Sequence, residues 1–183
     1  MLGFFFDQKK LYYIMEYAPG GELYKELTKN VRFSEKRAAR YVKQITNALI
    51  YIHKCNVVHR DIKPENVLLC ADDQVKISDF GWSVRALTTQ RKTMCGTLDY
   101  ICPEIICGKF YDYSVDIWTV GVLAYELTTG IAPFIHQDRK KQSANIVNVS
   151  ISYPNYLSPE IVDFISKLLQ KNPADRMRLE QAL

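Results

Sequence analysis

The chain has 183 residues, of which 48% are hydrophobic and 24% charged, and its net charge is +4. These values are typical of a globular protein of about one domain, with enough apolar side chains to form a core. The charge is too small to indicate a nucleic acid or an acidic membrane as partner, and no apolar run approaches the ~20 residues of a membrane-spanning helix. The basic run Arg139-Lys140-Lys141 is interpreted as a solvated loop.

The first predicted element is a hairpin of two aromatic-rich strands, residues 4–6 and 11–15, joined by Asp7-Gln8-Lys9-Lys10. An isolated two-stranded hairpin is marginal in water and leaves its rings exposed. We therefore expect this hairpin to belong to a larger sheet whose other strands are not in this chain. The sequence Ala18-Pro19-Gly20-Gly21 then breaks the second strand and is interpreted as a linker between two lobes.

Helices are predicted to dominate the rest of the chain. Ser34 is suited to cap a helix whose apolar residues recur every three or four positions from Ala38 to Ile52. Residues 117–127 are apolar nearly all round, which predicts a helix buried on every side. Ser158-Pro159-Glu160 combines a cap, a proline at the first position and an acid in the first turn, so it predicts the start of another helix.

Between the first two of these helices, residues 67–70 and 75–78 are predicted to form two short strands. If their turn centres on Asp72-Asp73, Asn66 faces Asp79 across the open end of this hairpin. Opposite residues of paired strands have Cα atoms ~5 Å apart. An amide oxygen and a carboxylate at that separation can share one hard cation such as Mg²⁺. Asp61 lies on the loop that feeds the same hairpin, so we expect the three side chains to converge.

The stretch VVHRDIKPENVLL, residues 57–69, places polar side chains between apolar flanks that belong in a core. A carboxylate, a cation and two magnesium-type ligands suit phosphoryl transfer, which needs positioning and charge neutralisation rather than covalent help. Asp61 is expected to orient the attacking hydroxyl and accept its proton, and Lys63 to neutralise the moving phosphoryl group. Asn66 and Asp79 are expected to hold magnesium on the nucleotide phosphates.

These motifs, in this order, resemble those of the eukaryotic protein kinases. HRDIKPEN matches the catalytic loop, Asp79-Phe80-Gly81 matches the magnesium-binding triplet, and Cys102-Pro103-Glu104 stands where the family has Ala-Pro-Glu. The stretches DFGWSV, RKTMCGTLDY and EYAPGGELYKEL are similar to those of Aurora-type serine/threonine kinases, over essentially the whole chain. The resemblance implies an α+β, protein-kinase-like fold. Residues 1–18 would be a remnant of the N-terminal lobe, with its hairpin and hinge, and residues 19–183 an α-helical C-terminal lobe that is truncated at its end.

No GxGxxG occurs in the 183 residues. We therefore expect the family's glycine-rich loop, its ATP-aligning lysine and the glutamate that pairs with this lysine upstream of residue 1. Two classes of function remain open. One is an enzyme that phosphorylates protein serine or threonine with ATP, which the intact Asp61, Asn66 and Asp79 favour. The other is a catalytically inactive kinase lobe that binds or regulates partners, which the missing lysine favours for the chain as given.

The resemblance also implies roles for single residues. Those implied for ATP binding are Met15, Glu16, Ala18, Glu22, Glu65, Asn66, Leu68 and Asp79. Those implied for substrate binding are Glu22, Glu65, Glu126 and Thr97. The regulatory residues are Thr93, as a phosphorylation site, and Arg60, which would receive its phosphate. The structural residues are Asp116 and the ion pair of Glu104 with Arg176.

The implied cofactors are ATP and Mg²⁺, and the implied partners are proteins with basic residues upstream of the target serine or threonine. An activator protein stays open, and neither nucleic acid nor a membrane is expected as partner. Five cysteines without a CxxC pair indicate reduced thiols, as in intracellular proteins. A location in the cytoplasm and nucleus, at the spindle, centrosome or chromosomes, follows from the resemblance alone.

Overall fold

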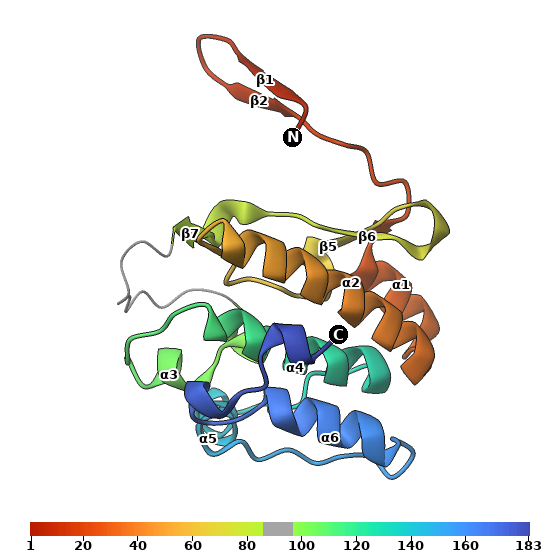
Figure 1. The fold of residues 1–183 in the computed structure, drawn as a ribbon, viewed down its shortest axis with the longest axis vertical. Coiled ribbons are helices and arrows are strands. Elements are labelled where there is room, and N and C mark those ends of the chain that lie inside the picture. The colour runs from red at the N-terminus through yellow and green to blue at the C-terminus, as the bar shows by residue number, and fades with distance from the viewer. Residues whose placement is uncertain (86–96) are drawn as a thin grey trace.

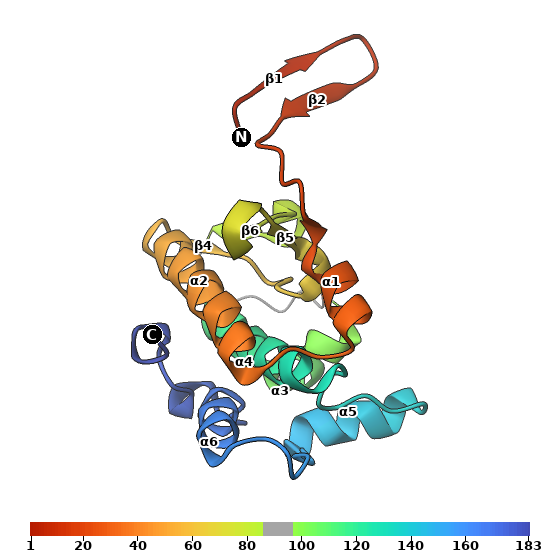
Figure 2. The same ribbon diagram turned by 90° about the vertical axis from the view of Figure 1, so that its right-hand side faces the viewer.

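The computed structural model describes residues 1–85 and 97–183. A helical body carries a small sheet on one side, and a hairpin extends away from both (Figures 1 and 2). The helices are α1 (Leu23–Asn30), α2 (Glu35–Lys54), α3 (Pro103–Ile106), α4 (Ser114–Thr129), α5 (Arg139–Asn148) and α6 (Pro159–Leu168). The strands are β1 (Gly3–Phe6), β2 (Leu11–Ile14), β3 (Gly21–Glu22), β4 (Val57–Val58), β5 (Val67–Leu69), β6 (Val75–Ile77) and β7 (Val84–Arg85). The 3₁₀ helices are η1 (Pro64–Asn66), η2 (Ala71–Asp73), η3 (Phe80–Trp82), η4 (Leu98–Tyr100), η5 (Pro173–Asp175) and η6 (Leu179–Gln181).

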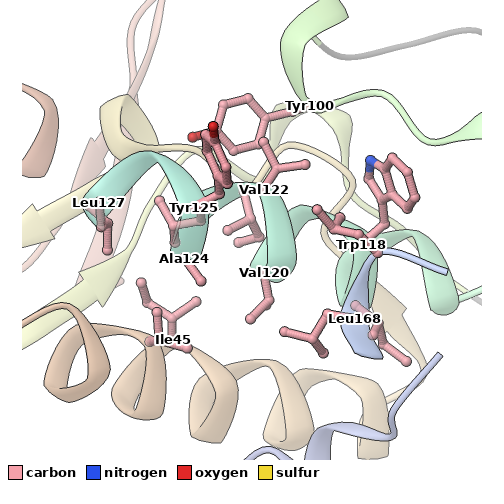
Figure 3. Close-up of a cluster of buried hydrophobic side chains, with 14 of the residues drawn as sticks. Ile45, Tyr100, Trp118, Val120, Val122, Ala124, Tyr125, Leu127 and Leu168 are labelled. Carbon is pink, nitrogen blue, oxygen red and sulfur yellow. The ribbon is translucent and has the colours of Figure 1, made fainter. Parts of the chain in front are cut away.

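Helix α4 is the centre of the helical body. It contacts α2 on one side and α6 on the other, and lies between them in Figure 1. Figure 3 shows side chains of α4, among them Val120, packed with Ile45 of α2 and Leu168 of α6. The prediction of a helix buried on every side is confirmed. Although α4 is strongly apolar, no helix among the described residues has both the length and the apolar character needed to cross a membrane.

The predicted caps of α2 and α6 are confirmed, and the two helix starts are joined. The Ser34 hydroxyl accepts a hydrogen bond from the Arg37 amide at 3.4 Å, and the Ser158 hydroxyl accepts one from the Ile161 amide at 3.3 Å. The Glu35 carboxylate in turn accepts bonds from the amide of Ser158 at 2.8 Å and from its hydroxyl at 2.6 Å. This contact ties α2 to α6 across 123 residues of sequence.

The basic run Arg139-Lys140-Lys141 does not lie in a loop, as the sequence was interpreted, but forms the first turn of α5. The Asp138 carboxylate caps this helix by accepting a hydrogen bond from the Lys140 amide at 2.8 Å. Gln142 and Ile146 anchor the helix because both are buried. The cap and these anchors outweigh the unfavourable interaction of three cations with the helix dipole.

Strands β1 and β2 form a sheet by themselves, with Phe4 opposite Tyr13 and Phe5 opposite Tyr12. The rings of Phe5 and Tyr12 stack at 4.7 Å between centroids. Most side chains of the hairpin are exposed, and Phe6 is 74% exposed. Within the described parts of the chain, no other strand pairs with this hairpin. A division of the chain near residue 18 remains a prediction.

Candidate functional site

The loop that begins at His59 is fixed by Asp116, a fully buried carboxylate of α4. The Asp116 carboxylate accepts hydrogen bonds from the backbone amides of His59 at 2.9 Å and Arg60 at 2.8 Å. Its Oδ2 also lies 2.8 Å from Nε2 of His53, on α2. Arg60 has a φ of 72°, a left-handed conformation that costs a non-glycine residue about 1–3 kcal/mol. The two amide bonds to Asp116 stabilise this strained turn.

His59 joins this loop to the end of β6. Its ring is buried, Nδ1 accepts a hydrogen bond from the Asp61 amide at 3.3 Å, and Nε2 lies 3.1 Å from the carbonyl of Ser78. Burial lowers the pKa of His59, so the neutral ring with its proton on Nε2 satisfies both contacts. The ring of Phe80 packs edge-on against His59 at 4.8 Å. His59 therefore positions Asp61 rather than carrying protons.

Asp61 lies at the centre of the site and is 3% exposed. Its Oδ2 accepts a hydrogen bond from Nδ2 of Asn66 at 2.8 Å and lies 3.1 Å from Nζ of Lys63. Lys63 also donates to the hydroxyl of Thr97 at 2.8 Å. The other oxygen, Oδ1, is buried and has no hydrogen-bond partner among the described residues. Buried polar atoms rarely stay unpaired, so Oδ1 is a free acceptor at the centre of the site as far as the described residues show.

Asn66 and Asp79 both lie at the open end of the β5–β6 hairpin, but they do not face each other as predicted. Val67 pairs with Ile77, and the carbonyl of Asn66 accepts hydrogen bonds from the amide of Ser78 at 2.8 Å and its hydroxyl at 3.0 Å. The register differs by one residue from the prediction because the turn is the three-residue η2, centred on residue 72, and is not centred between residues 72 and 73. Asp79 follows the last paired position directly.

The donor set at this end of the hairpin fits a magnesium ion. Asn66 directs its Nδ2 to Asp61, and its amide oxygen receives no hydrogen bond from the described residues. Asp79 is exposed, with a φ of 55°, and among the described residues only its Oδ1 is engaged, by the Gly81 amide at 3.0 Å. A Cβ at Gly81 would lie 2.9 Å from that oxygen, so a larger residue there would displace the Asp79 carboxylate. An amide oxygen and a carboxylate oxygen remain for a hard cation.

This combination of a fixed carboxylate, a lysine and two oxygen donors is accompanied by a match of the whole chain, residues 1–183, to the family model of the protein kinase domain. The chain belongs to the protein kinase family. It is 48% identical over 183 residues to Aurora kinase A-A of Xenopus laevis, with all of this chain and 45% of that protein covered. Aurora kinase of Schizosaccharomyces pombe is 48% identical and Aurora kinase C of Mus musculus 46%, with all of this chain and 52% and 66% of those proteins covered.

The comparisons confirm the kinase fold and the resemblance to Aurora kinases. The chain spans about half the length of the curated relatives it matches, since it covers 45% to 58% of the first five.

The residues that the kinase resemblance implies for nucleotide binding lie on two segments. Glu22 of β3 is paired with Leu68 of β5, which brings these two together beside the magnesium-type ligands. Glu16 makes an exposed ion pair with Lys76 of β6 at 3.4 Å, and the carbonyl of Ala18 accepts a hydrogen bond from the Gly21 amide at 3.2 Å. This hinge segment is therefore attached to the sheet. Met15 is 68% exposed and is not brought to these residues.

The acids implied for substrate binding lie around Tyr100 of η4. The hydroxyl of Tyr100 donates to Oε2 of Glu126, a partly buried residue near the end of α4. Burial raises the pKa of Glu126 to about 7; the Tyr100 hydrogen bond opposes this rise, and the negative charges of Glu65 and Asp99 add to it. Strand β3, which carries Glu22, contacts η1, which carries Glu65. Sequence reasoning missed Tyr100 because only the fold shows what its hydroxyl meets.

Glu104 and Arg176 form a bidentate ion pair, with both N–H···O distances 2.7 Å and both side chains buried. Arg176 also donates to the carbonyls of Ser114 and Gln170 at 3.0 Å, and its guanidinium lies 5.1 Å from the Trp118 ring. The pair thus fastens α3 to α4 and to the segment after α6. Its hydrogen bonds satisfy most donors of the guanidinium, as a buried charge requires.

Thr93, the predicted phosphorylation site, lies outside the described residues. Arg60, its predicted partner, is described: Nε donates to the carbonyl of Trp82 at 2.6 Å, and a terminal nitrogen donates to the Tyr111 hydroxyl at 2.8 Å. The regulatory role of both residues remains a prediction.

Proposed function

We propose that this kinase transfers the γ-phosphoryl group of ATP to serine or threonine hydroxyls of proteins. The observation that carries the proposal is the unpaired, buried Oδ1 of Asp61. Lys63 and Asn66 hold the other oxygen and so fix the carboxylate plane. Oδ1 is left to accept the hydrogen of a substrate hydroxyl, to orient its oxygen and to take up its proton during attack.

Lys63 has a second task in this proposal. Its ammonium group lies between Asp61 and Thr97, so it is held beside the carboxylate that receives the proton. A cation there stabilises the negative charge of the phosphoryl group as it moves. Mg²⁺, held by Asn66 and Asp79, would neutralise the charge on the nucleotide phosphates. The hydrogen bond between Lys63 and Thr97, with the similarity to serine/threonine kinases of the Aurora type, supports serine and threonine rather than tyrosine as acceptors.

The substrates are proteins with arginine upstream of the target residue. Glu65, Glu126 and Glu22 lie on elements that meet near the catalytic loop. The negative charge of Glu65 helps to raise the pKa of Glu126, which indicates that these two are close. Clustered carboxylates favour arginine through charge-assisted hydrogen bonds. Phosphorylation of Thr93, with Arg60 as the partner of its phosphate, would regulate activity. The kinase would act inside the cell, in mitosis, as its similarity to Aurora kinases supports.

The test of this proposal uses Asp61→Asn in the protein at its full natural length. The variant keeps the hydrogen bond from Asn66 but loses the base, so turnover is expected to fall roughly 10²-fold or more. Affinity for Mg·ATP should change little, because Asp61 is not among the proposed nucleotide ligands. Asp163→Asn, which removes an exposed ion pair with Lys167 on α6, is the control and should leave turnover unchanged.

Peptides that differ only in a serine, threonine or tyrosine acceptor complete the experiment. Phosphate should be transferred to serine and threonine and hardly to tyrosine. If Asp61→Asn keeps turnover within about a factor of two, Asp61 is not the base, since such a group contributes far more. Equal transfer to tyrosine would contradict the acceptor class.

A further inference from the structure

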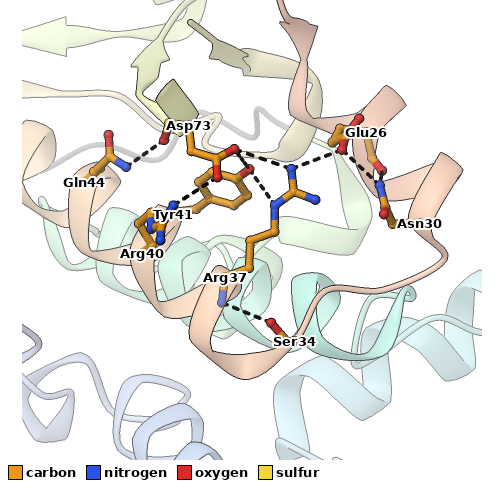
Figure 4. Close-up of polar contacts among 8 residues, drawn as sticks. All are labelled: Glu26, Asn30, Ser34, Arg37, Arg40, Tyr41, Gln44 and Asp73. Atoms are coloured by element: carbon orange, nitrogen blue, oxygen red, sulfur yellow. Dashed lines mark hydrogen bonds and ion pairs between the residues drawn. The ribbon is translucent and has the colours of Figure 1, made fainter. Parts of the chain in front are cut away.

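A cluster of polar side chains fastens the turn of the β5–β6 hairpin to α1 and α2, at the end opposite the magnesium-type ligands. Asp73, the last residue of η2, has a φ of 58° and closes the turn. This Asp73 cluster, drawn in Figure 4, consists of Glu26, Arg37, Arg40, Tyr41, Gln44 and Asp73.

The Asp73 carboxylate is held by three side chains of α2. Tyr41 donates to Oδ1 at 2.9 Å, Arg40 donates to Oδ2 at 3.0 Å, and Arg37 lies 3.5 Å from Oδ1. Arg37 also bonds to Glu26 of α1 at 3.1 Å. The hydrogen bond from Tyr41, with the charges of the arginines, lowers the pKa of Asp73, so the carboxylate is ionised at neutral pH. Asp73 thus connects the turn to α2 directly and to α1 through Arg37.

Gln44 holds the backbone of the same turn. Its Nε2 donates to the carbonyl of Asp73 and its Oε1 accepts from the amide of Val75, both at 3.0 Å. In the described sheet β6 is an edge strand, because the order is β3-β5-β6. An edge strand has unpaired backbone groups. The Gln44 amide pairs with one of them, the Val75 amide, and with the Asp73 carbonyl of the adjoining turn. The hairpin is therefore fixed by side chain and backbone together.

The fixed turn lies a short distance from the site. β5 and β6 have three residues each, which at ~3.3 Å per residue places the turn about 10 Å from the open end of the hairpin. At that end Asn66 bonds to Ser78, and Asp79 follows. Because the strands are paired along their whole length, a tilt of the turn also moves Asn66 and Asp79.

We infer that the Asp73 cluster positions Asn66 and Asp79 for the metal–nucleotide complex. The inference rests on the proposed function. The residues of the cluster are positioning residues, since they touch neither the substrate nor the metal ligands. Loss of the cluster should weaken metal–nucleotide binding through geometry, while the helical body stays folded around α4.

The experiment measures the Kd of Mn²⁺·ADP, by water-proton relaxation, for the full-length protein and its variants. Asp73→Gly removes every side-chain contact, yet glycine favours the left-handed backbone of this turn, so the loop can still form. Asp73→Asn also tolerates that backbone and still accepts the Tyr41 hydrogen bond, but lacks the charge. We expect the Kd to rise about tenfold for Asp73→Gly and about threefold for Asp73→Asn. These increases are no larger than the loss of metal affinity that follows removal of groups that orient metal ligands.

Glu35→Ala is the matched control, because Glu35 also anchors α2 but to α6 and far from the hairpin. It should lower the thermal midpoint without changing the Kd. Hydrogen exchange at the Ser78 amide, which bonds to Asn66, should accelerate in Asp73→Gly and not in Glu35→Ala.

The outcomes separate the two proposals. If the unaltered protein binds no Mn²⁺·ADP, the proposed function and this inference both fail. If it binds and Asp73→Gly binds equally well, only the positioning role is wrong. A Kd that rises equally in Glu35→Ala would show general destabilisation instead of positioning, and would overturn the inference as well.

Discussion

Glu126 should make the preference for arginine depend on pH. Its pKa is about 7 because the carboxyl is largely buried near Glu65 and Asp99. A carboxyl with that pKa is ~10% ionised at pH 6 and ~90% ionised at pH 8. Only the ionised form attracts an arginine strongly, and arginine stays charged throughout. If Glu126 binds the arginine, the preference should therefore rise roughly ninefold from pH 6 to pH 8.

The assay compares kcat/KM for two peptides that differ only by arginine or alanine at position −2 or −3. The ratio of the two values cancels pH effects on the chemical step, and kcat/KM reports the ionisation of the free enzyme. Glu126→Gln should abolish the pH dependence of the ratio. Tyr100→Phe should move its midpoint to higher pH, because the Tyr100 hydrogen bond lowers the pKa of Glu126.

A ratio that stays constant from pH 6 to pH 8 in the unaltered protein would refute this reasoning. So would a pH dependence that persists in Glu126→Gln, because another group would then be responsible.

Two further predictions concern stability. Arg176→Leu leaves Glu104 buried without its partner and should lower the free energy of unfolding, measured in urea, by about 3–5 kcal/mol. Adding Glu104→Leu to this variant should recover much of the lost stability. Equal losses in the single and the double variant would contradict the ion-pair account. Burial lowers the pKa of His59 below its usual 6.5, so its contribution to stability is present above that value and is lost as the pH falls through the lower pKa of the folded state. His59→Gln should flatten this acid limb, and an unchanged limb would assign it to another group.

Much of the fold was predictable because its signals are local. The caps Ser34 and Ser158, and the apolar run of α4, depend only on neighbouring residues, and the structure has all three. The start of α5 was missed because Asp138, its cap, precedes three cations that disfavour a helix start. The burial of Gln142 and Ile146, which anchors this helix, comes from tertiary packing and is not visible in the local sequence pattern.

In the candidate site, too, the features set by local sequence were predictable and those set by tertiary contacts were not. The sequence placed Asp61, Lys63, Asn66 and Asp79 on one loop and one hairpin, as the structure has them. It gave the wrong register, because the turn is a three-residue 3₁₀ helix centred on residue 72, which Asp73 closes with a left-handed backbone. That conformation is held by Arg40 and Tyr41 of α2, which are more than thirty residues away in sequence. The raised pKa of Glu126 was equally beyond reach, since it depends on burial.

A structure of the full-length protein with Mg²⁺, a non-hydrolysable ATP analogue and a serine peptide tests the central claim most directly. The account predicts the serine hydroxyl within about 2.6–3.2 Å of Asp61 Oδ1, the atom that has no partner among the described residues. It also predicts that Asn66 and Asp79 bind the metal through oxygen atoms. A hydroxyl that faces another group, or a metal bound without both of these residues, would contradict the account.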